Sequence, residues 1–375
     1  MTAAISYLFL QHYWWIIISL LGSLLVFLLF VQGGQTFILS LGKNDVEKTM
    51  IVNAFGRKWE FTFTTLVTFG GAFFASFPLF YATSFGGAYW VWVAILFSFI
   101  IQAVSYEFRS KPGNFLGAKT YEVFLFINGL LGPLLLGIAV ATFFTGSVFS
   151  LDEMNHVIWQ SPWKGLEAVT NPMNVILGLA ILFLARVLGL LYLLNSIDHQ
   201  DLLEKVRKKL VLNTVIFLVF FLTFVVWLLF ATGYAYDDTG KVFMEKNKYL
   251  HNLFQMPLNT LFFLLGVISV LWGLFISLFR NSDKGIWWTG AGTVLTVFAL
   301  FILVGFNRTS FYPSSYDLSS SLTIENASSS KYTLKTMFFV SFMVPFVVWY
   351  IWVAWKAINK KKITEEEMKE ESHIY

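Results

Sequence analysis

Long apolar stretches, separated by short polar or charged segments, dominate the pattern of hydrophobic and polar positions along this 375-residue chain. A membrane-spanning helix needs about 20 mostly apolar residues. Nine stretches meet that need: residues 14–40, 60–82, 86–106, 121–143, 172–194, 210–231, 257–279, 286–306 and 335–358. The sequence therefore predicts an all-α polytopic membrane protein with nine transmembrane helices in a single integral-membrane domain, followed by a polar tail over residues 360–375.

The composition agrees with this prediction and excludes several classes of protein. Charged residues make up 13% of the chain and hydrophobic residues 57%, whereas a soluble domain carries about 25% charged residues. A soluble enzyme, a disordered chain and a nucleic-acid-binding protein are therefore excluded. The chain has no Cys, which removes disulfide, zinc-thiolate and iron–sulfur sites and a cysteine nucleophile.

The basic residues alternate from loop to loop, as the positive-inside rule describes. With the N-terminus outside, the cytoplasmic segments carry 18 of the 26 Lys and Arg residues and the outer loops carry six. This asymmetry predicts an N-terminus outside and a C-terminus in the cytoplasm, and it explains the net charge of +4 without a nucleic-acid partner. Residues 1–13 contain no Lys or Arg, so the first stretch is expected to be a mature helix rather than a signal peptide.

Ionisable side chains at the cytoplasmic ends of the spans are the first functional candidates, because such groups are costly in a membrane. Glu60 opens the second span, Glu107 closes the third, and Arg109 follows it. Two interpretations are open for these three residues. They are either interfacial caps and snorkelling charges, or a polar entry that passes protons inward, for which a partly buried carboxylate is suited.

Further polar residues lie deeper in the predicted spans. Gln32 and Gln35 are late in the first span, Gln102 is near the end of the third, and Arg186 lies deep in the fifth. A mid-membrane Arg costs at least about 2.5 kcal/mol, so Arg186 should face protein, a partner subunit or water. A structural role with a carbonyl or carboxylate partner is favoured. Glu122 is expected to be a first-turn acid that the helix dipole favours.

The five histidines argue against haem binding by this chain alone. His12, His156, His199, His251 and His373 lie at span edges, in loops or in the tail. A haem in a helical bundle usually takes an axial His, Met or Cys from that bundle. We therefore expect no haem and no metal to be bound by this chain by itself.

Two pairs of adjacent glycines are candidates for helix packing. Gly33 and Gly34 lie in the first span, and Gly70 and Gly71 in the second. Small residues let membrane helices approach closely. We expect the first and second spans to form the surface that meets a partner subunit.

Several motifs together resemble a known family. Residues 59–82 read WEFTFTTLVTFGGAFFASFPLFYA, residues 107–111 read EFRSK, residues 312–315 read YPSS and residues 321–337 read SLTIENASSSKYTLKTM, with a G-x-x-Y-L run at 189–193. They resemble subunit II of cytochrome bd-type quinol oxidases, with the C-terminal motif the longest and most specific.

The chain also departs from that family's pattern. Gln32 and Gln35 stand where the first helix often carries acids, Gln102 replaces an Arg, and Leu188 replaces a His. A Gln amide cannot exchange a proton near neutral pH, so these positions put a proton route through the first helix in doubt. The match is intact at three candidate positions: Glu60, Glu107 and Arg109.

The resemblance implies a division of labour between two subunits in a bacterial inner membrane. Subunit II of the family has two four-helix bundles plus one peripheral helix, and it packs against a related subunit I that carries haems b and d and the main quinol site. The complex oxidises quinol and reduces oxygen to water. Subunit II is thought to add a cytoplasmic proton path, and some members hold a tightly bound quinone. Lipid and small accessory subunits are further partners that the resemblance suggests.

Two other functions remain open from the residues alone. A secondary transporter would place a substrate site near mid-membrane, often beside broken helices, and Arg186 is the one strongly charged candidate for it. A non-catalytic membrane scaffold would need neither site nor cofactor. Copurification with a haem-bearing partner would favour the oxidase, whereas substrate uptake by the chain alone would favour the transporter.

Overall fold

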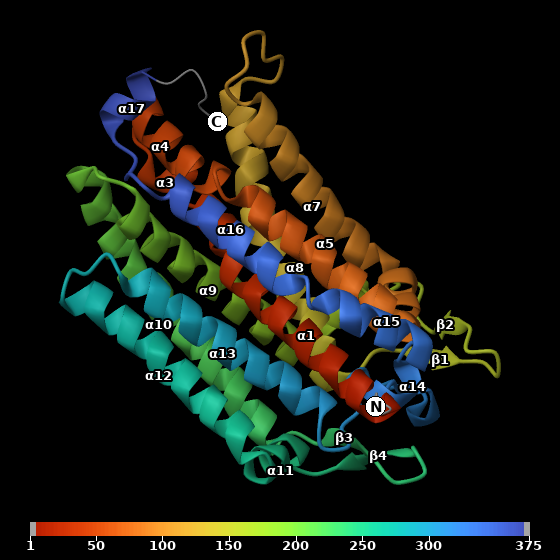
Figure 1. The fold of residues 1–375 in the computed structure, drawn as a ribbon. Coiled ribbons are helices and arrows are strands. Elements are labelled where there is room, and N and C mark those ends of the chain that lie inside the picture. The colour runs from red at the N-terminus through yellow and green to blue at the C-terminus, as the bar shows by residue number, and fades with distance from the viewer. Residues whose placement is uncertain (1–4, 371–375) are drawn as a thin grey trace.

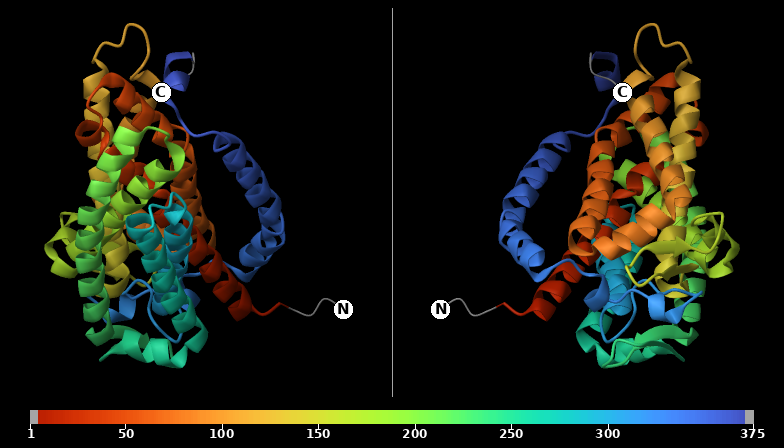
Figure 2. Two further views of the ribbon diagram at one scale, coloured as in Figure 1. Left: turned by 90° about the vertical axis from the view of Figure 1, so that its left-hand side faces the viewer. Right: turned by 90° about the vertical axis from the view of Figure 1, so that its right-hand side faces the viewer.

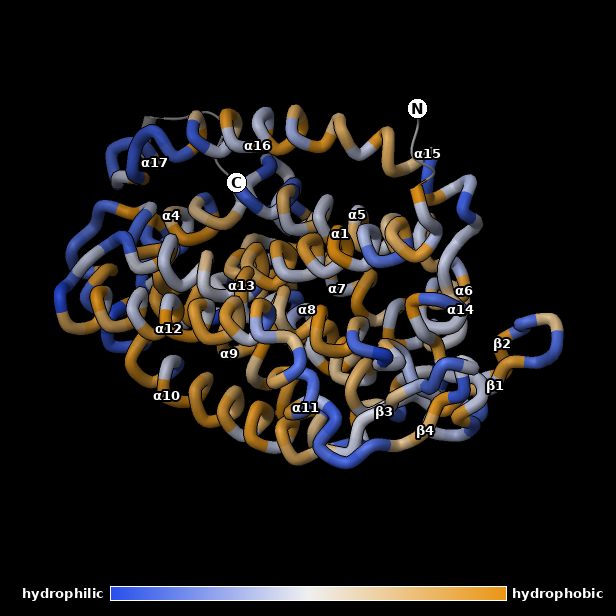
Figure 3. Tube along the Cα trace, turned by 60° about the horizontal axis from the view of Figure 1, so that its bottom comes forward, coloured by the Kyte–Doolittle hydropathy of each residue, from blue (hydrophilic) through white to orange (hydrophobic). Residues whose placement is uncertain are grey.

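The computed structural model describes residues 5–370. Long helices run side by side along one direction, and most of the short elements gather at the two ends (Figure 1). Apolar positions dominate the middle of the helices and hydrophilic ones the ends (Figure 3), as expected for a chain whose central zone lies in lipid. The molecule is therefore a mostly helical membrane protein.

Among the described residues, seven helices are long and apolar enough to cross a membrane. They are Tyr7–Gln35 (α1, Tyr7–Leu28, continued by α2, Phe30–Gln35), Tyr89–Phe108 (α7), Ala118–Thr145 (α8), Pro172–Ser196 (α9), Gln200–Phe230 (α10), Pro257–Phe279 (α12) and Gly285–Gly305 (α13). Each matches one predicted span. The prediction of Pro257–Phe279 agrees to the residue.

The other two predicted spans are less regular. The second corresponds to α5 (Trp59–Ser76), which packs against α1 but does not reach the same length and hydropathy as the seven. The ninth is a pair of helices, α15 (Lys331–Ser341) and α16 (Val344–Ile358), bent by 44°. Counted as one span, this pair brings the number in the described residues to eight.

Proline explains why these two spans are broken. Pro78 follows the end of α5, and Phe77 before it takes the extended φ of −134°, because the ring of a proline disfavours helical backbone at the preceding residue. The chain continues as α6 (Pro78–Tyr81) and a π-helical turn, Ala82–Gly87. Pro345 lies at the start of α16, where its missing N–H ends the hydrogen-bond ladder of α15.

Several predicted boundaries were wrong by up to ten residues. The first helix begins at Tyr7, seven residues before the predicted start, because the Ser6 side chain accepts a hydrogen bond from the N–H of Phe9 and caps it. α10 begins at Gln200 because its charged first turns extend the helix beyond the apolar zone. α8 begins at Ala118, so Glu122 lies beyond the first turn, contrary to the expectation.

One end of the molecule gathers the segments predicted to be cytoplasmic. They include α3 (Ile38–Leu41), α4 (Asp45–Gly56) and α17 (Glu365–Glu370). Ion pairs join them across the chain: Lys205 to Glu47, Arg57 to Glu367 and Lys362 to Asp283. The tail from residue 360 is not simply solvated, because Ile363 and Met368 are buried; its residues 371–375 lie outside the described part.

The opposite end holds the three long loops, which fold into more structure than predicted. Two antiparallel hairpins depart from an all-α fold: β1 (Phe149–Leu151) with β2 (Val157–Trp159), and β3 (Gly233–Tyr236) with β4 (Val242–Glu245). The short helices α11 (Lys248–Gln255) and α14 (Ile324–Ala327) complete this end (Figure 1). The pairing of distant loops, such as Ser147 with Ser314, ties the helix ends together.

Candidate functional site

One face of α7 carries a line of polar residues into the interior. Ser98, Gln102, Tyr106 and Arg109 recur at intervals of three or four residues and are all buried. Such spacing places them on one side of a helix, and at 1.5 Å per residue the line is about 16 Å long. It runs inward from the end of the molecule that gathers the predicted cytoplasmic segments.

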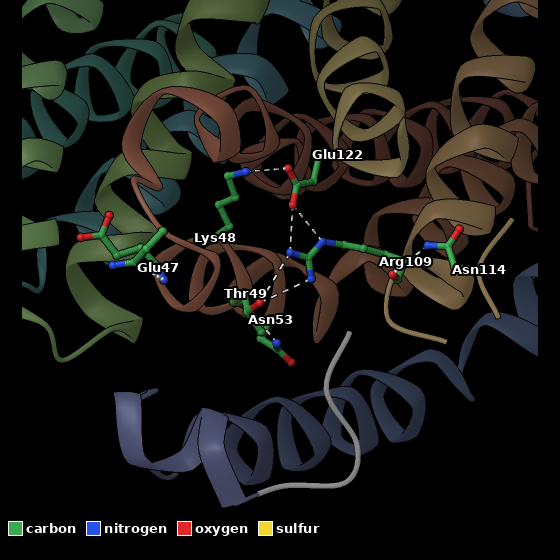
Figure 4. Close-up of polar contacts among 8 residues, drawn as sticks. Glu47, Lys48, Thr49, Asn53, Arg109, Asn114 and Glu122 are labelled. Carbon is green, nitrogen blue, oxygen red and sulfur yellow. Dashed lines mark hydrogen bonds and ion pairs between the residues drawn. The ribbon is translucent and has the colours of Figure 1, made fainter. Parts of the chain in front are cut away.

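An ion-pair cluster forms the outer end of this line (Figure 4). The Arg109 guanidinium donates to the Glu122 carboxylate on α8 at 2.9 Å, and lies 3.5 Å from the Thr49 hydroxyl on α4. The Lys48 ammonium approaches the second Glu122 oxygen at 3.2 Å. Arg109 and Glu122 are 8% and 2% exposed. A buried carboxylate is stable in its charged form only when such partners surround it.

A second carboxylate nearby is held in the same way. The Glu47 carboxylate accepts hydrogen bonds from the Lys205 ammonium at 2.9 Å and from the Lys43 N–H at 2.7 Å. Burial alone would raise the pKa of the Glu47 carboxyl, but these hydrogen bonds hold that pKa below its ordinary value. This end of α4 is thus fixed to α10 by a charged pair.

Deeper in the line, the side chains of α7 bind amides on neighbouring helices. Gln35 donates to the Tyr106 hydroxyl at 2.9 Å, and Gln32 donates to Gln102 at 3.2 Å. Further in, the Asn128 amide on α8 donates to the Ser98 hydroxyl at 3.4 Å. The structure therefore brings Gln32, Gln35 and Gln102 into one buried polar ladder with Arg109.

The ladder has more polar atoms than protein partners. Within the described residues, Gln32 Oε1, Gln35 Oε1, Gln102 Nε2 and Asn128 Oδ1 are buried without a hydrogen-bond partner. Each such atom costs about 1–3 kcal/mol if it stays unpaired, and ordered water is the usual partner of buried polar groups of this kind. The ladder is thus suited to hold water between its amides.

Arg186 occupies a separate polar site. Its guanidinium donates to the side-chain carbonyl of Asn213 at 2.7 Å and to the Thr36 hydroxyl at 2.9 Å, and it lies 4.3 Å from the centre of the Phe37 ring. The partners are a carbonyl, a hydroxyl and an aromatic face, within the protein as expected. These contacts hold α2, α9 and α10 together.

The three predicted proton-path residues lie in three different surroundings. Arg109 belongs to the buried cluster with Glu122. Glu107 is exposed and pairs at 3.2 Å with Lys111, which lies in the loop after α7. Glu60 is also exposed and lines a groove between α5 and α16. Of the three, the structure therefore places only Arg109 in the buried cluster.

The four candidate glycines divide into two kinds. A Cβ on Gly33 would lie 2.0 Å from the Ala185 backbone, and one on Gly34 would lie 1.9 Å from the Phe55 ring. Their close contacts are therefore inside this chain, contrary to the expectation that both face a partner. Gly70 is buried, and a Cβ added to it would make an ordinary van der Waals contact with the Phe85 ring. Gly71 is exposed, and a Cβ added to it would have no described atom within 4 Å.

Comparison with known proteins decides the family. Residues 10–358 match the family described as cytochrome bd terminal oxidase subunit II. The chain belongs to that family. It is 26% identical to cytochrome bd-I ubiquinol oxidase subunit 2 of Escherichia coli strain K12, over 98% of this chain and 99% of the relative. It is 29% identical to cytochrome bd ubiquinol oxidase subunit 2 of Bacillus subtilis strain 168, over 86% and 88%.

The fold of this bd oxidase subunit II is similar to a solved structure as well. The structure of bd oxidase from Geobacillus thermodenitrificans contains a chain that aligns with a TM-score of 0.64 at 13% identity, covering 93% of this chain and 98% of that one. At that identity the likeness concerns the fold. Family membership makes the chain a membrane-spanning subunit of a quinol oxidase complex.

Sequence reasoning missed the acid of the buried cluster. It assigned Glu122 to a helix end and gave Lys48 and Thr49 no role. One signal was present: Arg109 and Glu122 have opposite charges and flank a short loop between two predicted spans. Consecutive spans joined by a short loop are neighbours, so such charges can pair across the turn.

Proposed function

We propose that this chain is the haem-free subunit II of a cytochrome bd-type quinol:oxygen oxidoreductase, and that it supports a subunit I carrying haems b and d. The family and the names of the relatives support this proposal. The positions of four histidines support the haem-free part, since none of them lies in the middle of a long membrane helix. His12 is in the second turn of α1, His199 precedes α10, His156 is between β1 and β2, and His251 is in the short helix α11. In this division of labour the partner supplies the redox chemistry.

We propose the orientation from the two ends of the molecule. The segments that carry 18 of the 26 basic residues meet at the end formed by α4 and α17. The long loops meet at the opposite end, where α1 begins. The positive-inside rule assigns the basic end to the cytoplasm. The chain then has its N-terminus outside, its C-terminus inside and nine spans, with α5 and the bent α15–α16 pair as two of them.

The chain also contributes a cytoplasmic proton path in this proposal, and the single observation that carries it is the face of α5 that begins with Glu60. Glu60, Thr64 and Thr68 lie four residues apart and are all exposed. A carboxylate and two hydroxyls along a membrane helix need cover by protein or water. Covered by subunit I, this line provides exchangeable groups leading from the cytoplasmic end toward the partner.

The other predicted residues take supporting roles in this path. Glu107 is a carboxylate at the same aqueous end, where it collects protons beside Lys111. Arg109 is held by Glu122 and positions the end of α7. Gln32 and Gln35 serve the packing and hydration of the buried ladder.

The division of labour is tested by expressing the chain with and without its partner subunit. We expect a pyridine haemochrome assay to find haem in the purified pair of subunits. The chain purified alone should contain no haem in proportion to the amount of protein. Stoichiometric haem in the chain alone would overturn the proposal. Uptake of a solute by vesicles that contain this chain alone would favour the transporter instead.

A further inference from the structure

A large groove separates α16 from the rest of the molecule. Figure 2 shows α16 standing away from the helices beside it and joined to the body at its two ends. The groove has a volume of about 1170 Å³ and lies between α16, α1 and α5. Pockets for drug-sized ligands measure about 300–1,000 Å³, so the groove suits a larger occupant.

The walls of the groove are apolar and uncovered. Val348, Ile351, Trp352 and Trp355 form one stripe of α16 that faces the groove, at the spacing of a single helix face. Val348 and Trp352 are each 57% exposed, and within α16, all of which the structure describes, no residue is buried. An apolar stripe this open on its inner side needs apolar material between it and α1, where Leu24 and Leu28 line the groove.

Charged residues gather at one mouth of the groove, at the end assigned to the cytoplasm. Arg57, Lys360 and Lys361 line it together with the acids Glu60 and Glu367. Arg57 and Glu367 form an ion pair at 2.7 Å and so compensate each other. The two lysines are exposed, and against Glu60 they leave the mouth positive.

A buried lysine lies close to this mouth of the groove. Lys58 has no exposed surface, and its ammonium has no hydrogen-bond partner among the described residues. It lies 4.2 Å from the centre of the Trp355 ring and 5.6 Å from that of Phe61, and both rings line the groove. Lys58 therefore sits directly behind the groove wall.

From these observations we propose that the groove binds one anionic phospholipid, with its phosphate at Lys360 and Lys361 and its acyl chains between α16 and α1, beside the α5 face that subunit I covers. Basic pockets between membrane helices on the cytoplasmic side are suited to anionic headgroups. The apolar walls and the volume fit two acyl chains, and the charge surplus favours an anionic headgroup over a zwitterionic one. This site goes beyond the proposed function, because neither haem chemistry nor proton transfer requires it.

The site can be tested on the whole oxidase complex by native mass spectrometry. The complex is delipidated in detergent and titrated with phosphatidylglycerol or with phosphatidylethanolamine. We expect one phosphatidylglycerol to bind preferentially. The double variant K360Q/K361Q should weaken this binding about 25-fold, because each lysine near an anionic headgroup contributes a factor of about five.

Two controls separate the groove from surface charge in general. K208Q/K209Q removes two exposed lysines from α10 at the same end of the molecule and should leave the bound lipid in place. K360R/K361R keeps the charge and should retain it as well, so that a loss in K360Q/K361Q is not mistaken for misfolding. Leu24→Trp fills the groove wall on α1 and should remove the lipid with every lysine intact.

Three outcomes would overturn the proposal. The first is equal retention of phosphatidylglycerol by K360Q/K361Q and K208Q/K209Q. The second is equal binding of phosphatidylethanolamine, which would remove the argument from charge. The third is a neutral isoprenoid molecule that Leu24→Trp displaces and that loss of the lysines leaves in place. None of these results depends on oxidase turnover, so failure here would leave the proposed function standing.

Discussion

The guanidinium of Arg109, directly after α7, lies 2.9 Å from the carboxylate of Glu122 on α8, and the two side chains are almost fully buried. The pair closes the outer end of the polar ladder and fixes the turn between the two helices. Lys48 on α4 approaches the same carboxylate. Glu122 is therefore the acid on which three elements depend, although it is not among the residues that the family motifs single out.

Glu122→Gln should destabilise the protein. It leaves the buried Arg109 cation without its carboxylate, and breaking a buried pair costs about 3–5 kcal/mol. We expect a clearly lower melting temperature of the purified complex in detergent. Glu107→Gln, in which the acid is 63% exposed and forms an ion pair with the exposed Lys111, is the matched control and should melt like the wild type. Equal melting of the two variants would show that the buried pair does not hold the fold.

Glu60→Gln should lower quinol oxidase turnover several-fold or more while assembly and haem content stay normal. The amide keeps the shape and the hydrogen bonding of Glu60 but removes the exchangeable proton that a relay requires. Glu60→Asp keeps a carboxylate and should retain much of the activity. If Glu60 is only an interfacial cap, the Gln variant at full assembly will turn over almost normally, and Glu60 then has no part in the mechanism.

Lys58→Met should stabilise the protein most below neutral pH. Burial, with a smaller effect of Arg57, lowers the pKa of Lys58 from 10.5 to about 7. Below about pH 7 the folded chain must hold the charge of Lys58 in a buried place. Between about pH 7 and pH 10.5 the unfolded chain still binds a proton on Lys58 that the folded chain has released. Wild-type stability therefore rises with pH over that window.

The measurement for Lys58 is the melting temperature of wild type and variant at pH 6 and pH 9. We expect the advantage of Lys58→Met to be largest at pH 6 and to shrink by pH 9. Lys362→Met, which removes an exposed ion pair with Asp283, controls for a general loss of charge. A difference that is constant with pH would mean that Lys58 stays charged in the folded protein throughout this range.

Gly71→Leu should separate the chain from its partner without unfolding it. No described atom lies within 4 Å of its Cβ position, so the side chain fits this chain but projects from the exposed face of α5. Copurification with subunit I should be lost while the chain elutes as a single folded species. Gly33→Leu should instead abolish expression, because its Cβ would meet the Ala185 backbone at 2.0 Å. An intact complex with Gly71→Leu would mean that subunit I binds another face.

Much of the fold could be predicted because lipid imposes length and composition directly on the sequence. Every backbone group in the membrane must be paired, which makes each long apolar stretch a helix. Seven predicted spans are therefore found with the expected length and hydropathy. The prolines that break the other two, Pro78 and Pro345, are visible in the sequence, but whether such a residue bends or ends a helix depends on the neighbours that take up the freed groups.

The candidate site was harder to predict because charge alone does not show burial. Glu60, Glu107 and Glu122 all stand near the predicted cytoplasmic ends of spans, yet only Glu122 is buried. The rotation of each helix about its own axis decides this, and packing against other helices sets that rotation. The same reason separates Gly33, which contacts α9, from the exposed Gly71.

The sequence by itself determined the class of protein, the positions of most spans and the family, since hydropathy, charge asymmetry and motifs are properties of the chain written out in order. Only the tertiary structure decided which polar residues meet. It paired Arg109 with Glu122, aligned Gln32 and Gln35 with α7, and left Glu60 on an open groove. Those relations arise where segments distant in the chain pack together, and pairwise packing in three dimensions is not encoded in any local pattern.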